Sequence, residues 1–241
     1  MSLSEIFPID QWNFKSQSIL QSIPPEDHEQ LCANMTVESY NKGDVIFKEG
    51  AVPSGIFYIQ KGMVKKYKVD RDGREQIIHV ASSGELIGYH AILAEERYPD
   101  SASTIEACSI AFIPKEDFLE VLGSSSVLSQ RLLKNLSHEF AVLTNNMSAM
   151  TQRTAREKVA ITLIVLREKY KSMEDNENGI INISRSDLSN MAGIAKENLV
   201  RILKEFKNND ILQTEGRKIT INDVKKLVEI SNTNHKPRRI V

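Results

Sequence analysis

Residues 184–206 read Ser-Arg-Ser-Asp-Leu-Ser-Asn-Met-Ala-Gly-Ile-Ala-Lys-Glu-Asn-Leu-Val-Arg-Ile-Leu-Lys-Glu-Phe, and this stretch decides the fold of the second half of the chain. Ser184 is a good N-cap, and Asp187 follows three residues later, as in a capping box. Leu188 and Met191 give the first predicted helix an inner face, and Gly193 supplies a tight turn. The stretch therefore predicts two short helices joined by a turn.

The second of these helices is strongly amphipathic. Its apolar side chains recur at a spacing that places them on one stripe: Leu199, Ile202, Leu203 and Phe206. The other face carries Lys196, Glu197, Val200, Arg201 and Lys204. A helix that buries one stripe and offers Lys, Glu and Arg near its N-terminus can enter the major groove of DNA. The alternative is that this face only contacts solvent. Features of the rest of the chain distinguish a DNA-binding face from a solvated one.

Composition indicates an ordinary globular protein. The chain has 241 residues, enough for one large or two modest domains, with 41% hydrophobic and 26% charged residues. No apolar run approaches the ~20 residues that span a bilayer, and the first residues lack the features of a signal peptide. We therefore expect a cytoplasmic protein with no membrane partner. Cys32 and Cys108 have no metal or redox spacing, which predicts small core residues rather than a disulfide.

Charge is distributed unevenly along the chain. Residues 1–150 carry 13 Lys/Arg and 20 Asp/Glu, whereas residues 151–241 carry 18 Lys/Arg and 12 Asp/Glu. The first part is thus acidic and the second basic, although the whole chain has a net charge of only −1. This asymmetry predicts that only the second part binds a polyanion.

The first part changes character along its length. Residues 1–35 have a weak helical pattern broken at Pro24-Pro25. Short runs of β-branched and aromatic residues then follow at 45–47, 56–59, 63–67, 76–80 and 110–113, with glycine turns between them. Asp72-Gly73 is a hairpin signal. The pattern predicts an antiparallel sandwich or roll.

A helical region follows Pro114 and contains a heptad seam. Apolar residues spaced alternately three and four apart form this seam: Leu133, Leu136, Phe140, Leu143, Met147 and Met150. The spacing predicts a dimerisation helix, and the alternative is a seam that packs on its own domain.

After the long helix, a polar hinge is expected at 151–154, a helix at 155–170, a charged loop at 171–179 and a short strand at 180–183. Beyond the helix pair, residues 211–221 read as a hairpin with the basic tip Glu215-Gly216-Arg217-Lys218. A hairpin in this position is the wing of a winged helix-turn-helix domain.

This order of parts resembles the cyclic-AMP receptor / fumarate–nitrate regulator (Crp/Fnr) family of bacterial transcription factors. Three stretches carry the resemblance: residues 42–50 with 58–62, residues 84–88, and residues 183–203. It implies an α+β fold with an N-terminal antiparallel β-roll of the cyclic-nucleotide-binding type at 1–125. The resemblance also implies a dimerisation helix and hinge at 126–153, followed by a C-terminal winged helix-turn-helix DNA-binding domain at 154–241. The implied protein is a homodimer that binds double-stranded DNA and contacts RNA polymerase.

Residues for DNA reading follow from the resemblance and from chemistry. Family members carry a glutamate and, four residues later, an arginine on the recognition helix, as Glu197 and Arg201 do here. A carboxylate accepts from cytosine N4, and a guanidinium binds guanine O6 and N7. Lys196 matches a basic family position, whereas Ala195 departs from the usual hydroxyl cap. The alternative is a surface i,i+4 ion pair. The predicted DNA-binding residues are Arg185, Ser186, Lys196, Glu197, Asn198, Arg201, Lys204 and Lys218.

The effector site departs from the cyclic-nucleotide pattern. Gly84-Glu85-Leu86 matches the start of the family's phosphate-binding cassette, which ends with Arg-Ser-Ala, but here Asp100 precedes Ser101 and Ala102. A carboxylate repels a phosphate, so we do not expect cyclic AMP to bind, and Glu85 can then serve only to order a turn. If a pocket is retained, its predicted residues are Gly84, Glu85, Leu86, Ser101, Ala102, Leu143 and Thr144.

No cofactor is expected. An iron–sulfur cluster needs about four thiolates and the chain has two cysteines. His79 and His90 could serve as axial ligands of a haem iron, but lone histidines are more often structural. No metal ligands and no catalytic residues are predicted, which argues against an enzyme. The leading prediction is a dimeric, sequence-specific transcription regulator that reads an inverted repeat with TGA-like half-sites. The other alternative is a cyclic-nucleotide-responsive signalling module that does not bind DNA. The sequence leaves open the effector, the target genes, and activation or repression.

Overall fold

The computed structural model describes residues 3–14, 16–20, 23–172, 176 and 178–232. Its contacts divide the chain into two compact units, one of residues 14–140 and one that joins residues 3–13 to residues from 141 onward. Part of the charged loop predicted at 171–179, and residues 233–241 of the predicted C-terminal domain, lie outside the described residues.

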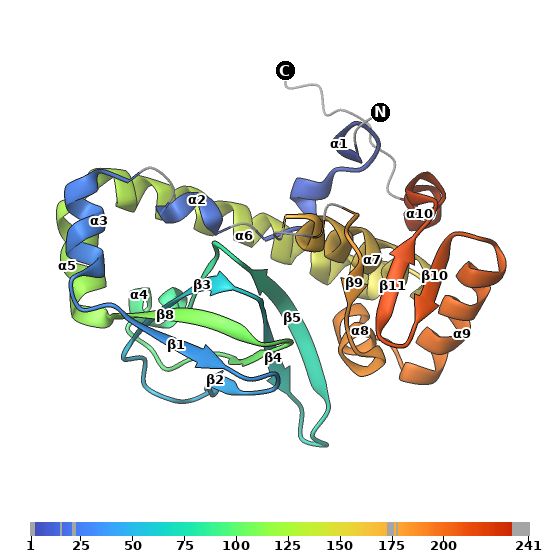
Figure 1. The fold of residues 1–241 in the computed structure, drawn as a ribbon, viewed down its shortest axis with the longest axis horizontal. Helices are drawn as coiled ribbons and strands as arrows, with labels where there is room; N and C mark the ends of the chain where they lie inside the picture. The colour runs from blue at the N-terminus through green and yellow to red at the C-terminus, as the bar shows by residue number, and fades with distance from the viewer. Residues whose placement is uncertain (1–2, 15, 21–22, 173–175, 177, 233–241) are drawn as a thin grey trace. The chain divides into compact units, whose positions relative to one another are not determined.

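The effector unit, residues 14–140, is built on two four-stranded antiparallel sheets (Figure 1). One has the order β1-β8-β3-β6 and the other β2-β7-β4-β5. Their strands are β1 (Thr36–Tyr40), β2 (Val45–Phe47), β3 (Gly55–Lys61), β4 (Met63–Val69), β5 (Glu75–Ser82), β6 (Leu86–Ile87), β7 (Ser101–Thr104) and β8 (Cys108–Pro114). This arrangement confirms the predicted β-roll.

Turn chemistry sets the β4–β5 hairpin. Gly73 adopts a φ of +78°, which a residue with a Cβ rarely does. Asp70 Oδ1 accepts from the backbone N–H of Asp72 and of Arg74, each at 2.9 Å. The predicted hairpin signal at Asp72-Gly73 is therefore confirmed.

Helices close the effector unit on one side. They are α2 (Gln17–Leu20), α3 (Pro25–Cys32), α4 (Tyr89–Leu93), α5 (Lys115–Ser124) and the first part of α6 (Ser126–Gln152). One apolar cluster joins these helices to the first sheet through Leu31, Ile56, Tyr89 and Phe118. Pro24 and Pro25 stand at the N-cap and N1 of α3, so the proline pair that breaks the N-terminal pattern also begins a helix.

Helix α6 presents most of its heptad seam to solvent. Leu128 and Leu132 pack in the effector-unit core, and Leu136 packs against it in part. The other seam residues have large exposed fractions: Leu133 64%, Phe140 74%, Leu143 39%, Met147 70% and Met150 42%. The alternative that the whole seam packs on its own domain therefore fails for these five residues.

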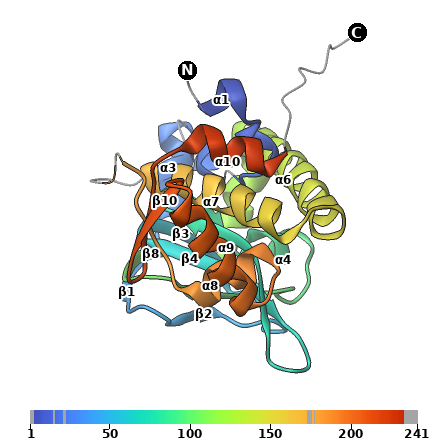
Figure 2. The same ribbon diagram turned by 90° about the vertical axis from the view of Figure 1, so that its right-hand side faces the viewer.

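The C-terminal unit contains the predicted helix pair and hairpin (Figures 1 and 2). Its elements are α1 (Leu3–Ile6), η1 (Ile9–Gln11), α7 (Ala155–Lys171), β9 (Ile181–Asn182), α8 (Arg185–Ala192), α9 (Lys196–Asn208), β10 (Leu212–Glu215), β11 (Lys218–Ile221) and α10 (Val224–Ser231), together with the last part of α6. The three strands form one sheet in the order β10-β11-β9. Thr154, the last residue of the predicted hinge, forms with Glu157 a reciprocal capping box that starts α7. Thr151 and Gln152, also predicted as hinge, belong instead to the end of α6. Among the described residues, no helix is long and apolar enough to cross a membrane.

Candidate nucleic-acid interface

Local capping builds the first helix of the pair. Ser184 Oγ accepts from the backbone N–H of Asp187 at 2.9 Å, as predicted for an N-cap. The Ser184 hydroxyl donates a hydrogen bond to Asp187 Oδ2 at 2.5 Å. Gly193 closes α8 with φ 62° and ψ 43°, the left-handed conformation that lets the chain turn into α9. Figure 2 shows α8 and α9 side by side at the turn.

Helix α9 has one buried and one exposed face. Leu199, Ile202, Leu203 and Phe206 are at most 5% exposed, as predicted. Lys196, Glu197, Val200, Arg201 and Lys204 are all exposed. At about 100° per residue these five side chains fall within an arc of about 140°. The exposed face is therefore a single continuous surface, and it begins at the helix N-terminus.

The guanidinium of Arg201 is held by a neighbour on its own helix. Arg201 Nη2 donates to Asn198 Oδ1 at 2.8 Å. This bond joins residues three apart on the helix, and Glu197, four residues before Arg201, lies on the same face. The alternative of a Glu197–Arg201 ion pair has no support in this contact, because the hydrogen bond of Arg201 goes to Asn198. Ala195, the N-cap of α9, makes no side-chain capping bond, as its methyl group dictates.

The wing is tied to the start of α8. Arg185 Nη2 donates to the carbonyl of Gly216, at the hairpin tip, at 2.9 Å. Burial lowers the pKa of Arg185 from its ordinary value, and its Nη1 has no hydrogen-bond partner among the described residues. Such a donor suits an anion such as a DNA phosphate. Lys218 is exposed beside the tip, opposite Glu215 in the hairpin register, and Ser186 is exposed in the first turn of α8.

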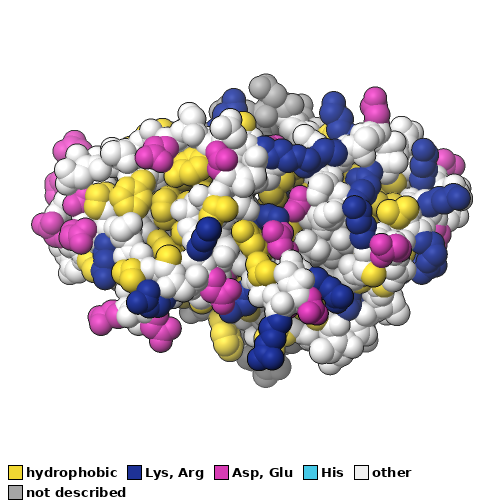
Figure 3. Space-filling model, turned by 90° about the horizontal axis from the view of Figure 1, so that it is seen from below, with side chains coloured by type: hydrophobic (Ala, Val, Ile, Leu, Met, Phe, Trp, Pro, Cys, Tyr) yellow, Lys and Arg dark blue, Asp and Glu magenta, His cyan; other side chains and the backbone are white. Residues whose placement is uncertain are grey.

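The geometry adds one residue to the predicted set. Val200 is 51% exposed although its neighbours on the face are charged. It lies three residues after Glu197 and one before Arg201, inside the exposed arc of α9. An apolar group on a DNA-reading face can contact a thymine methyl. Figure 3 shows that Lys and Arg side chains gather over the C-terminal unit, on the right of that view.

In the effector unit, Asp100 is already neutralised by a partner. Lys66 Nζ lies 3.0 Å from Asp100 Oδ2, and their side chains are only 12% and 9% exposed. Lys66 on β4 stands opposite Ala102 of β7, which brings the ammonium beside the carboxylate. The position where the family's phosphate-binding arginine would stand therefore belongs to a buried internal ion pair.

Glu85 orders the turn at the start of the family's cassette. Its Oε1 accepts from the Ser82 backbone N–H at 3.2 Å and from the Ser82 hydroxyl at 2.9 Å, and its Oε2 lies 3.3 Å from His79 Nε2. Glu85 is 1% exposed. A carboxylate with these contacts works as a structural group inside the protein.

The remaining predicted effector residues differ in their surroundings. Leu86 donates its backbone N–H to Ser16 Oγ at 2.8 Å, and Ser101 Oγ accepts from the Glu49 backbone N–H at 3.0 Å. Ala102 is fully buried in the core between the sheets. Leu143 and Thr144 are exposed on the part of α6 that belongs to the C-terminal unit, and Gly84 lies in the turn before β6. That these residues form one pocket remains a prediction.

A buried carboxylate joins α4 to α6. Glu139 is 5% exposed and accepts from the Tyr89 hydroxyl at 2.6 Å, His90 Nε2 at 2.6 Å and Asn135 Nδ2 at 3.0 Å. Burial opposes ionisation of Glu139, but the hydrogen bonds and charge of His90 and the bond from Tyr89 outweigh it and lower its pKa to about 2. The same burial and the Glu139 charge raise the pKa of Tyr89. No local sequence pattern indicates this network, since its members lie up to 50 residues apart.

The described part of the chain contains no group of three or more His, Cys, Asp or Glu residues that could hold a metal ion. The two cysteines do not share one environment. Cys108 is buried in the β-roll core, as predicted, but Cys32 is only half-buried on α3. The prediction of a core role for Cys32 is therefore wrong, because the end of α3 faces an open cavity rather than packed side chains.

Two family models match the chain in the predicted order. Residues 37–125 match the cyclic nucleotide-binding domain, and residues 157–230 match the Crp-like helix-turn-helix domain.

Curated proteins and a solved structure agree with these matches. The chain is 27% identical over 194 residues to the anaerobic regulatory protein of Aggregatibacter actinomycetemcomitans, covering 80% of this chain and 75% of that protein. It is 28% identical over 183 residues to the transcriptional activator protein FnrA of Stutzerimonas stutzeri, covering 76% and 75%. The fold is similar to that of FixK2 from Bradyrhizobium japonicum, with a TM-score of 0.72 at 22% identity over 81% of this chain and 96% of that one.

Proposed function

Since this chain belongs to the Crp/Fnr family of transcription regulators, we propose that it works as a homodimer that reads an inverted-repeat operator with the exposed face of α9. The observation that carries this proposal is the continuous exposed arc at the N-terminal end of α9, a helix whose opposite face is buried. The arc consists of Lys196, Glu197, Val200 and Arg201. A recognition helix contacts base edges with this end. Family evidence favours regulation over catalysis, and we propose no enzymatic role.

The dimer proposal rests on the seam of α6. Five seam residues, at 133, 140, 143, 147 and 150, leave apolar side chains in solvent along one face of a 27-residue helix. A second copy of the same helix would bury that face by heptad packing. A two-fold dimer then presents two copies of α9 to half-sites one helical turn apart, about 34–36 Å from centre to centre.

We assign roles within each half-site from side-chain chemistry. Arg201 binds a guanine through O6 and N7, and Glu197 accepts from a cytosine amino group. Asn198 orients Arg201 through its hydrogen bond. Arg185 and Ser186 at the start of α8, with Lys196, Lys204 and Lys218, contact phosphates, and the half-site contains a TGA-like core.

We further propose that cyclic AMP is not the effector. A cyclic phosphate needs a cation to neutralise it, whereas Asp100 is a carboxylate and the cation beside it, Lys66, is engaged by that carboxylate. Calorimetry with the native protein tests this and should show no binding; micromolar affinity would contradict the proposal. No iron–sulfur cofactor is proposed, since two cysteines supply too few thiolates for a cluster, and we assign no haem ligand.

Partners and location follow from the proposed activity. A regulator at a promoter acts on RNA polymerase, and we propose a contact with it. Chromosomal DNA in bacteria lies in the cytoplasm, which is where the protein would act.

The experiment is selection of bound DNA from a random pool with the native protein. The expected product is an inverted repeat whose half-site centres lie one turn apart and contain a G and a C at the positions assigned to Arg201 and Glu197. If no sequence is enriched from the pool, or if the enriched sequence is a single half-site without two-fold symmetry, the proposal is contradicted.

A further inference from the structure

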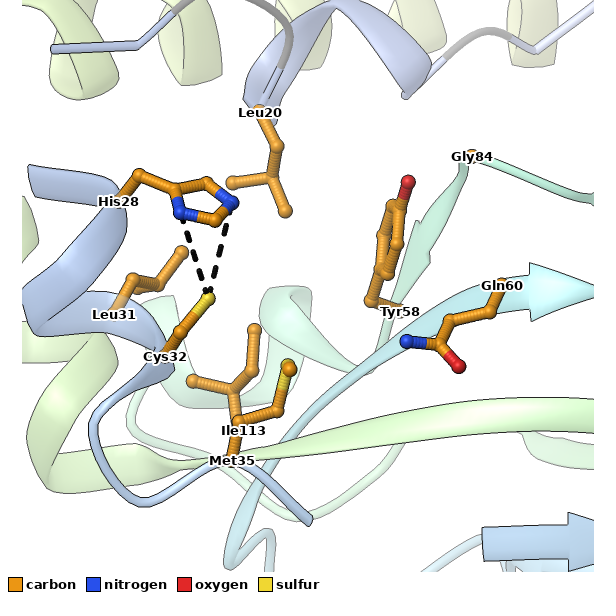
Figure 4. Close-up of a pocket in the computed structure, with 9 residues that line it drawn as sticks. All are labelled: Leu20, His28, Leu31, Cys32, Met35, Tyr58, Gln60, Gly84 and Ile113. Carbon is orange, nitrogen blue, oxygen red and sulfur yellow. Dashed lines mark hydrogen bonds between the residues drawn. The ribbon is translucent and has the colours of Figure 1, made fainter. Parts of the chain in front are cut away.

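The effector unit contains a cavity beside Cys32, at the end of α3. It has a volume of about 490 Å³ and lies between α2 and α3 on one side and β3 and β8 on the other (Figure 4). Of the residues predicted for the effector pocket, only Gly84 lines it. The volume is within the range of about 300–1,000 Å³ that small-molecule sites occupy.

The wall of this cavity is mostly apolar. Leu20, Leu31, Met35 and Ile113 face it, together with the ring of Tyr58. No Asp, Glu, Lys or Arg side chain is among the described residues that line it. A charged ligand would find no counter-ion there, so burial of its charge would be unfavourable. The lining therefore selects an uncharged molecule.

Four polar side chains line the wall: His28, Cys32, Tyr58 and Gln60. Gln60 Oε1 accepts from Ser109 Oγ at 3.0 Å, which fixes the side-chain amide, and Figure 4 shows the amide nitrogen directed toward the hollow. Cys32 Sγ lies 3.9 Å from both ring nitrogens of His28. Burial raises the pKa of the Cys32 thiol, which keeps it neutral at pH 7. A ligand that carries a hydrogen-bond acceptor can thus be oriented by the Gln60 amide.

We propose that this cavity is a binding site for an uncharged, mostly apolar small molecule that carries a hydrogen-bond acceptor. Apolar walls with a few placed polar groups are the usual composition of such sites. The proposal concerns binding to the effector unit alone and does not depend on the DNA-reading role.

The position of the cavity gives an occupant access to the core. Leu31 and Ile113 belong to the apolar cluster that also contains Leu128 and Leu132 of α6. Three further lining residues pack against this cluster: Leu20, Met35 and Tyr58. A molecule in the cavity would therefore extend the packed core that holds the first turns of the long helix.

The test uses 6-propionyl-2-(dimethylamino)naphthalene with the full chain, because this probe is neutral and mostly apolar, its ketone oxygen is a hydrogen-bond acceptor, and its emission changes in apolar surroundings. Saturable binding of one molecule per chain with a Kd of about 10 µM or lower is expected. Met35→Trp fills the cavity and should weaken binding at least tenfold. Gln60 is exposed at the rim of the cavity, so Gln60→Trp should also weaken probe binding at least tenfold without changing the core. This variant provides the test if Met35→Trp fails to fold. The matched control is Val52→Trp, at a site 68% exposed and outside this cavity, which should leave the Kd unchanged.

Alkylation gives a second readout because the chain has only two cysteines and Cys108 is buried. N-ethylmaleimide should react with Cys32, and saturating probe should slow that reaction at least fivefold while leaving reaction with glutathione unchanged. Three results overturn the proposal: no saturable binding up to 100 µM probe, equal binding by the cavity variants and Val52→Trp, or a Cys32 alkylation rate that the probe does not alter.

Discussion

Replacing Glu139 with Gln should destabilise the effector unit in a pH-dependent way. The carboxylate is 5% exposed and accepts from Tyr89, His90 and Asn135, and its pKa is lowered from 4.5 to about 2. At 1.36 kcal/mol per pKa unit, this shift corresponds to about 3 kcal/mol of stability at pH 7. Since the folded-state pKa is depressed, the stabilisation is present above the unfolded pKa and is lost as pH falls from about 4.5 toward 2.

Gln keeps the shape of Glu139 but not its charge. At pH 7 the thermal midpoint of the Glu139→Gln variant should be about 6–12 °C below that of the native protein, because 1 kcal/mol shifts a protein of this size by about 2–4 °C. At pH 3.5 the native advantage should shrink to about 2 kcal/mol. Scanning calorimetry at both pH values measures the difference. The control is Glu120→Gln, an exposed carboxylate on α5, which should change little at either pH. A Glu139→Gln deficit that is absent at pH 7, or that grows as the pH falls, would refute the reasoning.

Three other predictions follow from exposed residues. Phe140→Glu with Leu143→Glu places charges in the seam and should give a folded monomer by light scattering; a dimer that persists would rule out this interface. Lys218→Ala at the wing should weaken DNA binding evenly across sequences and reduce the salt slope by about one, whereas a change in base preference would contradict a phosphate role. Replacing one operator thymine by uracil should cost the native protein up to about 1 kcal/mol of DNA-binding free energy, whereas the affinity of the Val200→Ser variant should not change. If both proteins lose the same affinity, Val200 does not contact the thymine methyl group.

Local patterns were sufficient to predict the helix-turn-helix and wing. Ser184 and Gly193 act on their own neighbours, and the apolar stripe of α9 has the helical period, so the sequence alone carries this information. Strands with alternating or continuous apolar residues, such as β3 and β5, were also predictable.

The missed strands lack that signal for physical reasons. β1 has no fully buried residue, because it lies at the edge of its sheet. β7 is fully buried but consists of Ser101, Ala102, Ser103 and Thr104, which show no hydrophobic period. β6 has two residues, too few for any pattern. Pairing partners far apart in sequence, not local propensity, determine these strands.

Long-range polar contacts could not be predicted from the sequence. The Asp100 substitution was visible, but its partner Lys66 became evident only when β4 and β7 were paired. The same is true of Glu139 with Tyr89. Asn198 was predicted to bind DNA, and the structure adds a hydrogen bond to Arg201 that the i,i+3 spacing could have suggested.

The most direct test of the DNA-reading account is the affinity of Arg201→Ala for an operator panel in which each base pair of one half-site is substituted in turn. Lys204→Ala, on the same face of α9, is the matched control. Arg201→Ala should lower the binding free energy for the selected operator by about 1–3 kcal/mol. The variant should no longer prefer G at one position, while its base preference at the other positions should remain. Lys204→Ala should weaken all sequences alike. If Arg201→Ala lowers affinity equally for every member of the panel, Arg201 contacts only phosphate and α9 does not read the operator through this face.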